Sequence, residues 1–302
     1  MNQHILLTGA TGMLGKDLIQ TLLKRGNKVS ILSRKLHQID QVKVFLWDAE
    51  QQKIDMACLD GVDSIIHLAG ENIAKGKWTD QRKKEIIDSR VLSTQLLFKT
   101  IATNPNQVKN FISAAAIGYY GTRGDEILTE ESTPGHNFLA ECCIQWEKAI
   151  DQGQQLKLRI VKIRTGVVLA KNDGALKAMA TPINLFAGAP LGSGKQWVPW
   201  IHYQDMTRVY LHALDNELLT GAYNATAPHP VTNKQMTKAI AKQLHRPVWP
   251  FSVPEKILQL ILGEMSSMVI NSTRTTAQKI ESTGFIFKYT QLEQALSDIY
   301  GS

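Results

Sequence analysis

The sequence contains few cysteines, and their number and spacing exclude two kinds of site. Cys58, Cys142 and Cys143 are too few for a disulfide framework. Cys142 and Cys143 are adjacent, and adjacent cysteines lack the spacing of a zinc-binding pair. We interpret all three as buried or half-buried thiols in a reducing compartment. No metal is expected, and no neighbouring group in the sequence is arranged to lower a thiol pKa and make a nucleophile.

Long hydrophobic runs are also absent. No apolar run reaches the roughly 18 residues that a membrane span needs, and the first residues lead into a predicted strand without the basic and apolar pattern of a signal peptide. The composition of the 302 residues, 43% hydrophobic and 20% charged, is that of an ordinary globular protein. We therefore expect a cytoplasmic protein without a membrane partner.

The positive charge is not gathered in one stripe of the sequence. The formal net charge is +7, but the basic cluster at 82–84 is balanced by Asp80 and Glu85. No nucleic-acid partner is therefore expected, although a steep salt dependence of binding would reveal an RNA-binding role as an alternative. We interpret the surplus as favouring small anionic ligands.

Apolar runs typical of strands alternate with segments of helical periodicity through the first half of the chain. The strand-like runs occupy residues 3–8, 28–33, 43–47, 63–69, 110–116 and 157–164. This alternation predicts an α/β fold, a Rossmann-type doubly wound parallel sheet with helices on both faces. We predict a dinucleotide-binding domain over residues 1–170, to which segments near 201–227 return, and a smaller, mostly helical C-terminal substrate lobe over 171–302.

Three glycines follow the first predicted strand in the segment 8-TGATGMLG-15. Gly9, Gly12 and Gly15 permit a tight turn, close approach of the backbone to a pyrophosphate, and close packing of the next helix on the sheet. The N-terminus of that helix offers unpaired N–H groups to phosphate. A strand before the glycines and an amphipathic helix after them are the context that this interpretation requires.

The end of the second predicted strand indicates which dinucleotide binds. An NAD site would place an acidic residue there for the ribose hydroxyls, whereas this chain has Ser33, Arg34 and Lys35. A hydroxyl and a guanidinium suit a 2′-phosphate. The sequence therefore predicts NADP(H) as the cofactor; a solvated basic loop is the alternative.

Four further motifs resemble those of a known family. The segments 65-IIHLAGENI-73, 111-FISAAAIGYYG-121, 164-RTGVVL-169 and 200-WIHYQDM-206 are similar to those of the extended short-chain dehydrogenase/reductases, in particular an atypical epimerase-like subgroup with a distinct C-terminal domain. The resemblance covers essentially the whole chain. It implies cofactor contacts at Gly9, Thr11, Gly12, Met13, Leu14, Gly15, Ser33, Arg34, Leu68, Ala69, Gly70, Glu85, Arg90 and Val168. For Arg90, an ion pair on the helix surface with Asp88 or Glu85 is the alternative.

The catalytic pair of the larger family is missing. Ordinary members use Tyr-x-x-x-Lys, in which the lysine lowers the tyrosine pKa so that its hydroxyl exchanges a proton during hydride transfer. Alignment on Glu147 places Leu139 and Cys143 at these positions, and a shift of one residue places Phe138 and Cys142 there. Neither register supplies an acid.

Other residues could take over proton transfer. Tyr119 and Tyr120 follow the fifth predicted strand and Glu71 follows the fourth, so all three are candidate catalytic residues. The alternatives are that the two tyrosines form walls of the nicotinamide pocket and that Glu71 caps the segment after it. The sequence thus predicts an NADP(H)-dependent, epimerase-like oxidoreductase with an unknown small-molecule substrate. A cofactor-binding sensor with little catalysis is the rival, and a homodimer is compatible with the resemblance.

Overall fold

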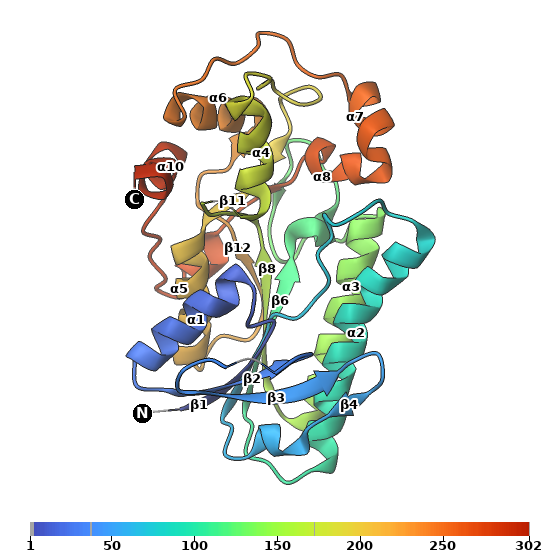
Figure 1. The fold of residues 1–302 in the computed structure, drawn as a ribbon, viewed down its shortest axis with the longest axis vertical. Helices are drawn as coiled ribbons and strands as arrows, with labels where there is room; N and C mark the ends of the chain where they lie inside the picture. Colours follow the sequence, from blue (N-terminus) through green and yellow to red (C-terminus); the bar gives the residue numbers. More distant parts are fainter. Residues whose placement is uncertain (1–2, 37, 172, 302) are drawn as a thin grey trace.

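An eight-stranded sheet forms the centre of the molecule in the computed structural model, which describes residues 3–36, 38–171 and 173–301 (Figure 1). The strand order is β12 (Gly221–Ala225), β8 (Arg159–Thr165), β6 (Asn110–Ala116), β5 (Ser64–His67), β1 (His4–Thr8), β2 (Lys28–Ser33), β3 (Val42–Asp48) and β4 (Lys53–Ile54). The strands from β12 to β3 are parallel, and β4 pairs antiparallel with β3 at the edge of the sheet. The predicted Rossmann-type fold is confirmed.

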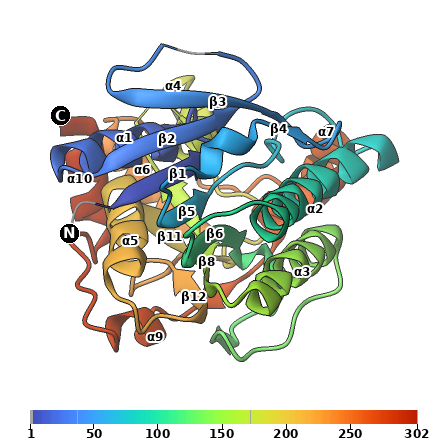
Figure 2. The same ribbon diagram turned by 90° about the horizontal axis from the view of Figure 1, so that it is seen from below.

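Helices cover both faces of this sheet. Figure 2 shows α1 (Met13–Lys24) and α5 (Tyr203–Asp215) on one face, and α2 (Asp80–Thr103) and α3 (Phe138–Asp151) on the other. Alternate side chains of β1 pack on opposite faces of the sheet. Ile5 and Leu7 pack on the side of α1 and α5, and Leu6 packs on the side of α2 and α3. Burial on both faces explains why the strands are continuous apolar runs.

A further apolar core lies beyond the carboxyl ends of the strands. It gathers Trp200 with side chains of α4 (Gly174–Asn184), α6 (Asn233–Gln243) and α10 (Leu292–Gly301). Three short strand pairs accompany it: β9 (Val167–Leu169) with β11 (Trp200–His202), β10 (Trp197–Val198) with β13 (Val231–Thr232), and β7 (Ile127–Leu128) with β14 (Arg274–Thr275). The division of the chain near residue 170 stays a prediction.

The C-terminal segment also contacts the helices on the far face of the sheet. After α7 (Glu255–Leu262) comes the 3₁₀ turn η4 (Gly263–Ser266), in which Glu264 forms a 2.5 Å salt bridge with Lys83 of α2. Met265 packs against a cluster that includes Trp78 and Phe138. The elements α8 (Ser267–Ile270) and α9 (Gln278–Glu281) follow. These contacts hold the end of α7 against α2 and α3.

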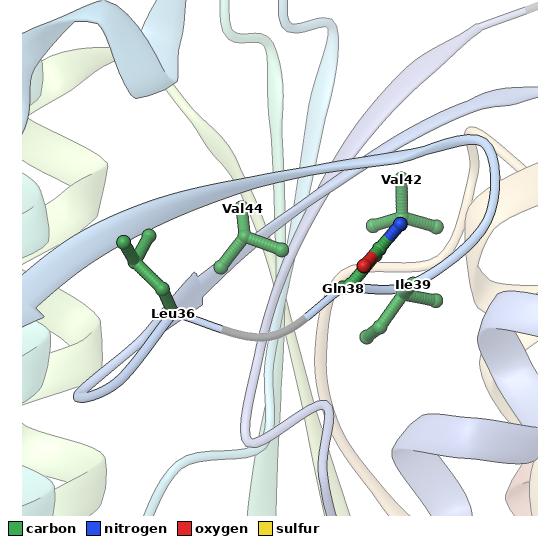
Figure 3. A pocket seen from close by; sticks show the side chains of 5 residues that line it. All are labelled: Leu36, Gln38, Ile39, Val42 and Val44. Carbon is green, nitrogen blue, oxygen red and sulfur yellow. The ribbon is translucent and has the colours of Figure 1, made fainter.

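The connection from β2 to β3 contains no helix among its described residues, and it leaves a hollow of about 440 Å³ beside the sheet (Figure 3). Its lining consists of Leu36, Gln38, Ile39, Val42 and Val44. Val42 and Val44 pair with Val29 and Ile31, below the carboxyl end of β2 at Ser33. The hollow therefore lies on the flank of the sheet and not at the edge where ligands of such sheets bind.

None of the helices in the described part of the chain combines the length and the apolar character that a membrane crossing demands. The remaining short turns are η1 (Met56–Leu59), η2 (Ile117–Tyr120) and η3 (Gln152–Leu156). Of these, η2 directly follows β6 and carries both candidate tyrosines. It therefore brings them to the carboxyl edge of the sheet, beside the ends of β5 and β8.

Candidate cofactor and active site

The three glycines after β1 differ in what the fold requires of them. Gly9 has φ +67°, and a Cβ there would lie 2.7 Å from the carbonyl carbon of Leu68; at Gly15 a Cβ would lie 2.5 Å from the Cα of Ala10. The fold itself therefore needs glycine at both positions. Gly12 has ordinary backbone angles and room for a Cβ, which would meet only the Gly9 carbonyl at 3.5 Å. Close approach of a ligand is a reason for glycine at this third position.

Helix α1 begins without a side-chain cap. Its N-cap is Gly12, its first turn holds no acidic residue, and no side chain accepts from its first N–H groups. The helices α2 to α6 have a side-chain acceptor at the N-cap, namely Thr79, Asn137, Asp173, His202 and Thr232, whereas α7, α8 and α9, like α1, have none. The turn before α1 is open as well, because Thr11 and Gly12 are exposed while Met13 and Leu14 are half-buried. Such free donors at the end of β1 are suited to an anion.

A buried hydroxyl fixes the loop after β5 against this turn. The Oγ1 of Thr8 accepts hydrogen bonds from the N–H groups of Leu68 and Ala69, both at 3.1 Å. Its own proton is then free for the Nδ1 of His67, 2.7 Å away. Leu68 and Ala69 are half-buried and Gly70 is exposed, so they line the crevice between the ends of β1 and β5.

His67 joins this loop to α2 as a neutral ring. With Nδ1 accepting from Thr8, the proton lies on Nε2, which is 3.2 Å from the hydroxyls of Ser93 and Thr94. Complete burial, aided by the Arg90 cation, lowers the pKa of His67 to about 3. The imidazole is therefore a structural link between β1, β5 and α2.

A cluster of charged side chains lies at the end of β2. The Arg34 guanidinium reaches the Oε1 of Glu71 at 3.3 Å, and Arg82 reaches the Oε2 at 3.2 Å. Because β1 lies between β5 and β2 in the sheet, the Arg34–Glu71 contact spans the end of β1. Arg34 is 79% exposed, whereas Ser33 is buried at the strand end. The exposed guanidinium is thus available to an anion from solvent.

Glu85 and Arg90 lie on the side of α2 that faces this loop. Glu85 pairs with Arg82 at 3.0 Å, and the guanidinium lowers the pKa of the Glu85 carboxyl. Arg90 donates to the backbone carbonyls of Ile86 and Glu71 at 2.9 and 3.1 Å. A Cβ at Gly70 would lie 3.1 Å from the Arg90 Cζ, so glycine leaves space for this guanidinium.

Arg90 also has an aromatic partner. Its guanidinium lies 5.1 Å from the ring centre of Trp146, and Asp88 pairs with Lys84 instead of with Arg90. The surface ion pair that we considered for Arg90 therefore does not form with Asp88 or Glu85. Arg90 is instead a half-buried cation that supports the loop at 70–71.

The structure distinguishes the two registers considered for the missing catalytic pair. A Cβ on Gly118 of η2 would lie 3.4 Å from the Leu139 Cβ and 3.5 Å from the Cys143 Sγ. These two residues thus face the segment that follows β6. Cys142 belongs to the apolar cluster around Trp78, and Phe138 and Leu139 both pack against that cluster. Burial raises the pKa of both thiols, which disfavours a cysteine nucleophile.

The two candidate tyrosines have different surroundings. Tyr120 is fully buried, and its hydroxyl donates to the Asn224 Oδ1 at 2.7 Å and accepts from the Arg164 Nη1 at 2.9 Å. Burial raises its pKa to about 12, although Arg164 acts in the opposite direction. Tyr119 is half-buried, with its ring centre 3.7 Å from the Arg164 Cζ. Tyr119 is therefore the tyrosine with access to a ligand.

A buried ion pair beneath these tyrosines was not predicted from the sequence. Arg164 of β8 and Glu147 of α3 are each 4% exposed and form two hydrogen bonds, at 2.7 and 3.0 Å. Burial alone would lower the pKa of Arg164, but the carboxylate raises it. The sequence carried only a weak signal for this pair, because Arg164 is one of three basic residues in β8.

Val168 and Ser113 also lie near the carboxyl ends of the strands. Val168 is half-buried in β9 and pairs with Ile201, in the segment that leaves β8. Ser113 is buried and donates to the carbonyl of Ala114, so its hydroxyl does not point to a ligand. The predicted cofactor contacts thus come from the loops that follow β1, β2, β5 and β8 and from α2. Glu71, in the loop after β5, is half-buried and pairs with both Arg34 and Arg82.

Comparison with known proteins agrees with this geometry. The model of the NAD dependent epimerase/dehydratase family matches residues 5–225, and a domain of unknown function, DUF1731, matches residues 253–299. The epimerase family protein YfhF of Bacillus subtilis is 37% identical over 98% of this chain and 97% of its own length. A chloroplastic SDR39U1 homolog of Arabidopsis thaliana is 36% identical over 98% of this chain and 86% of its own.

A solved structure extends the comparison. The crystal structure of the human epimerase family protein SDR39U1 with NADPH has a TM-score of 0.87 and 28% identity, and the match covers 99% of this chain and 100% of that one. The sheet order, the glycine turn after β1 and these matches lead to one assignment. The chain belongs to the NAD dependent epimerase/dehydratase family.

Proposed function

We propose that this protein binds NADP(H) across the carboxyl end of β1, with the 2′-phosphate at Ser33 and Arg34. Gly12 gives the pyrophosphate its close approach, and the uncapped start of α1 supplies N–H donors. The observation that carries the choice of phosphate is the exposed Arg34 guanidinium at the end of β2, where an NAD site would have an acid. The human relative crystallised with NADPH supports the same choice.

We further propose an epimerase-like oxidoreductase reaction. The nicotinamide, when bound, would exchange hydride with a small substrate held between the sheet and the C-terminal lobe. Because Leu139 and Cys143 carry no acid, the proton must come from another group. Tyr119 and Glu71 are the candidates for this role. The buried, doubly bonded hydroxyl of Tyr120 favours a structural role for that residue.

A second function is supported by one specific observation. Leu139 and Cys143, one of the two pairs that could replace the family's tyrosine and lysine, both face Gly118. Loss of both groups favours a sensor that reports the NADP(H) redox state with little catalysis. In that case Glu71 and Arg82 would serve binding alone.

The two functions separate in a single-turnover experiment. Purified protein is first titrated with NADPH and with NADH, and then the NADPH complex is mixed with aldehydes, ketones and quinones while absorbance at the nicotinamide band is followed. An oxidoreductase consumes NADPH with at least one class of carbonyl compound, and Tyr119→Phe slows that step. A sensor binds NADPH and leaves it intact with the whole panel. Failure to bind either nucleotide would contradict both functions.

A further inference from the structure

Large apolar side chains are exposed together at the far end of the C-terminal region. Leu185 and Phe186 follow α4 with 72% and 56% exposure, and Trp249 and Phe251 lie between α6 and α7 with 58% and 76%. We call these four residues the apolar tip. In Figure 1 the segment that joins α6 to α7 arches over the end of the molecule away from β2 and β3. Such a group is larger than the single apolar residues that scatter over most surfaces.

Backbone and side-chain bonds hold the tip together. The Trp249 N–H donates to the Gly188 carbonyl at 2.8 Å, and the Trp249 indole donates to the Phe186 carbonyl at 2.9 Å. These two bonds fix the Trp249 ring against the segment that follows α4. Helix α7 extends the apolar surface along the chain, since its Ile257, Leu260 and Ile261 are 45%, 86% and 65% exposed.

Positive charge accompanies this apolar surface. Lys234, Lys238 and Lys242 are exposed at four-residue spacing, so they form one stripe along α6, and no described acidic side chain pairs with them. Arg246 follows, with its guanidinium 4.8 Å from the Phe186 ring centre. With Lys256, residues 233–262 hold five cations against the single carboxylate Glu255, which is +4 of the chain's net +7.

We propose that the apolar tip and the α6 lysines dock this protein on the surface of an anionic lipid bilayer. An anionic bilayer binds both the apolar side chains and the cations, because its interface takes up aromatic and aliphatic side chains while its headgroups attract lysine and arginine. Single-stranded RNA would stack on Trp249 and Phe251 but would gain little from Leu185. The proposal concerns attachment to one face of a membrane and is independent of the cofactor.

Vesicle flotation tests the proposal with the full chain. At about 0.1 M salt, the protein should float with vesicles that contain about 30% phosphatidylserine and stay behind with phosphatidylcholine alone, and about 0.5 M salt should release it. Lys238→Ala with Lys242→Ala should lower the partition coefficient about 25-fold, since each cation near an anionic surface contributes about fivefold. Trp249→Ser with Phe251→Ser should lower it at least tenfold.

Two variants control for unspecific effects. Leu218 is 89% exposed but lies outside the tip, so Leu218→Ser should float as the unmodified protein does. Trp249→Phe keeps an aromatic anchor and should still float, but it should lose the fluorescence quenching by brominated lipids that the unmodified protein shows. Circular dichroism of each variant establishes that it is folded.

Four results would overturn the proposal. The protein could ignore anionic vesicles, or Leu218→Ser could weaken flotation as much as the tip variant does. Binding to a single-stranded RNA homopolymer without binding to vesicles would instead identify the surface as a nucleic-acid site. Concentration-dependent dimerisation that Trp249→Ser abolishes, without vesicle binding, would identify a contact between copies of the chain.

Discussion

Arg34 offers a quantitative test of the cofactor site. Its guanidinium is 79% exposed and 3.3 Å from Glu71, so the contact contributes at most about 1 kcal/mol in the free protein. A charge-assisted contact with a 2′-phosphate contributes about 1.5–3 kcal/mol. Arg34→Ala should therefore weaken NADPH binding about 10- to 150-fold. NADH lacks the phosphate, and its affinity should change less than about twofold.

Glu71 allows the same contact to be tested from the other side. In the free protein its carboxylate competes with the phosphate for Arg34, so Glu71→Gln should tighten NADPH binding by up to about fivefold and leave NADH unchanged. Isothermal titration with both nucleotides measures these changes. Arg25→Ala is the matched control, because it removes an exposed guanidinium that pairs with Asp215 on another part of the surface. Equal losses of NADPH and NADH affinity in Arg34→Ala would refute the placement of the phosphate.

Three further predictions concern the groups beneath the site. Tyr120→Phe should lower the free energy of unfolding by about 1–3 kcal/mol in urea titrations, because it leaves the buried Asn224 oxygen without its donor; an unchanged midpoint would contradict the buried network. Glu147→Ala should lower it by about 3–5 kcal/mol, because Arg164 would stay buried without its carboxylate, and a loss below 1 kcal/mol would show that water reaches this pair. His67 binds a proton near pH 6.5 when unfolded but only near 3 when folded, so stability falls as pH falls between these values, by about 2 kcal/mol from pH 7.5 to 5.0. Urea titrations of His67→Gln should lack this part of the pH dependence, and an identical slope would disprove it.

Much of the fold was predictable because the relevant signals are local. A strand, three glycines and an amphipathic helix follow one another within the first 24 residues, and the alternation of strands and helices indicates a parallel sheet. The placement of Arg34 at the carboxyl end of the strands was predictable for the same reason. It follows directly from the end of β2 at Ser33.

The contacts that give Tyr119 and Tyr120 different surroundings could not be predicted from local signals. The Tyr120 hydroxyl bonds to Asn224, 104 positions away in β12, and Arg164 bonds to Glu147 from a different element. Pairings over such separations depend on how helix α3 packs on the sheet, and local periodicity carries no information about them. The neighbours of Leu139 and Cys143 could not be predicted for the same reason, because only the fold places both beside Gly118.

The apolar tip was missed because it combines segments that are individually unremarkable. Leu185 and Phe186 lie more than sixty positions before Trp249, and only the fold brings these segments together. The expectation of no membrane partner depended on the absence of long apolar runs, which addresses membrane crossing and not attachment to a membrane surface. The lysines of α6 were counted among scattered charges, although their four-residue spacing places them on one face.

The contrast among the three glycines has a practical consequence for work in cells. Alanine at residue 9 or 15 would disturb both folding and nucleotide binding. The resulting phenotype could not be assigned to one of these two causes. Alanine at residue 12 meets nothing closer than 3.5 Å inside the protein, so its methyl group would obstruct the dinucleotide alone. A strain carrying that one allele should retain a folded protein, because the added methyl group makes no close contact within it. It would show which functions of this protein depend on a bound nucleotide and which depend only on the presence of the folded protein.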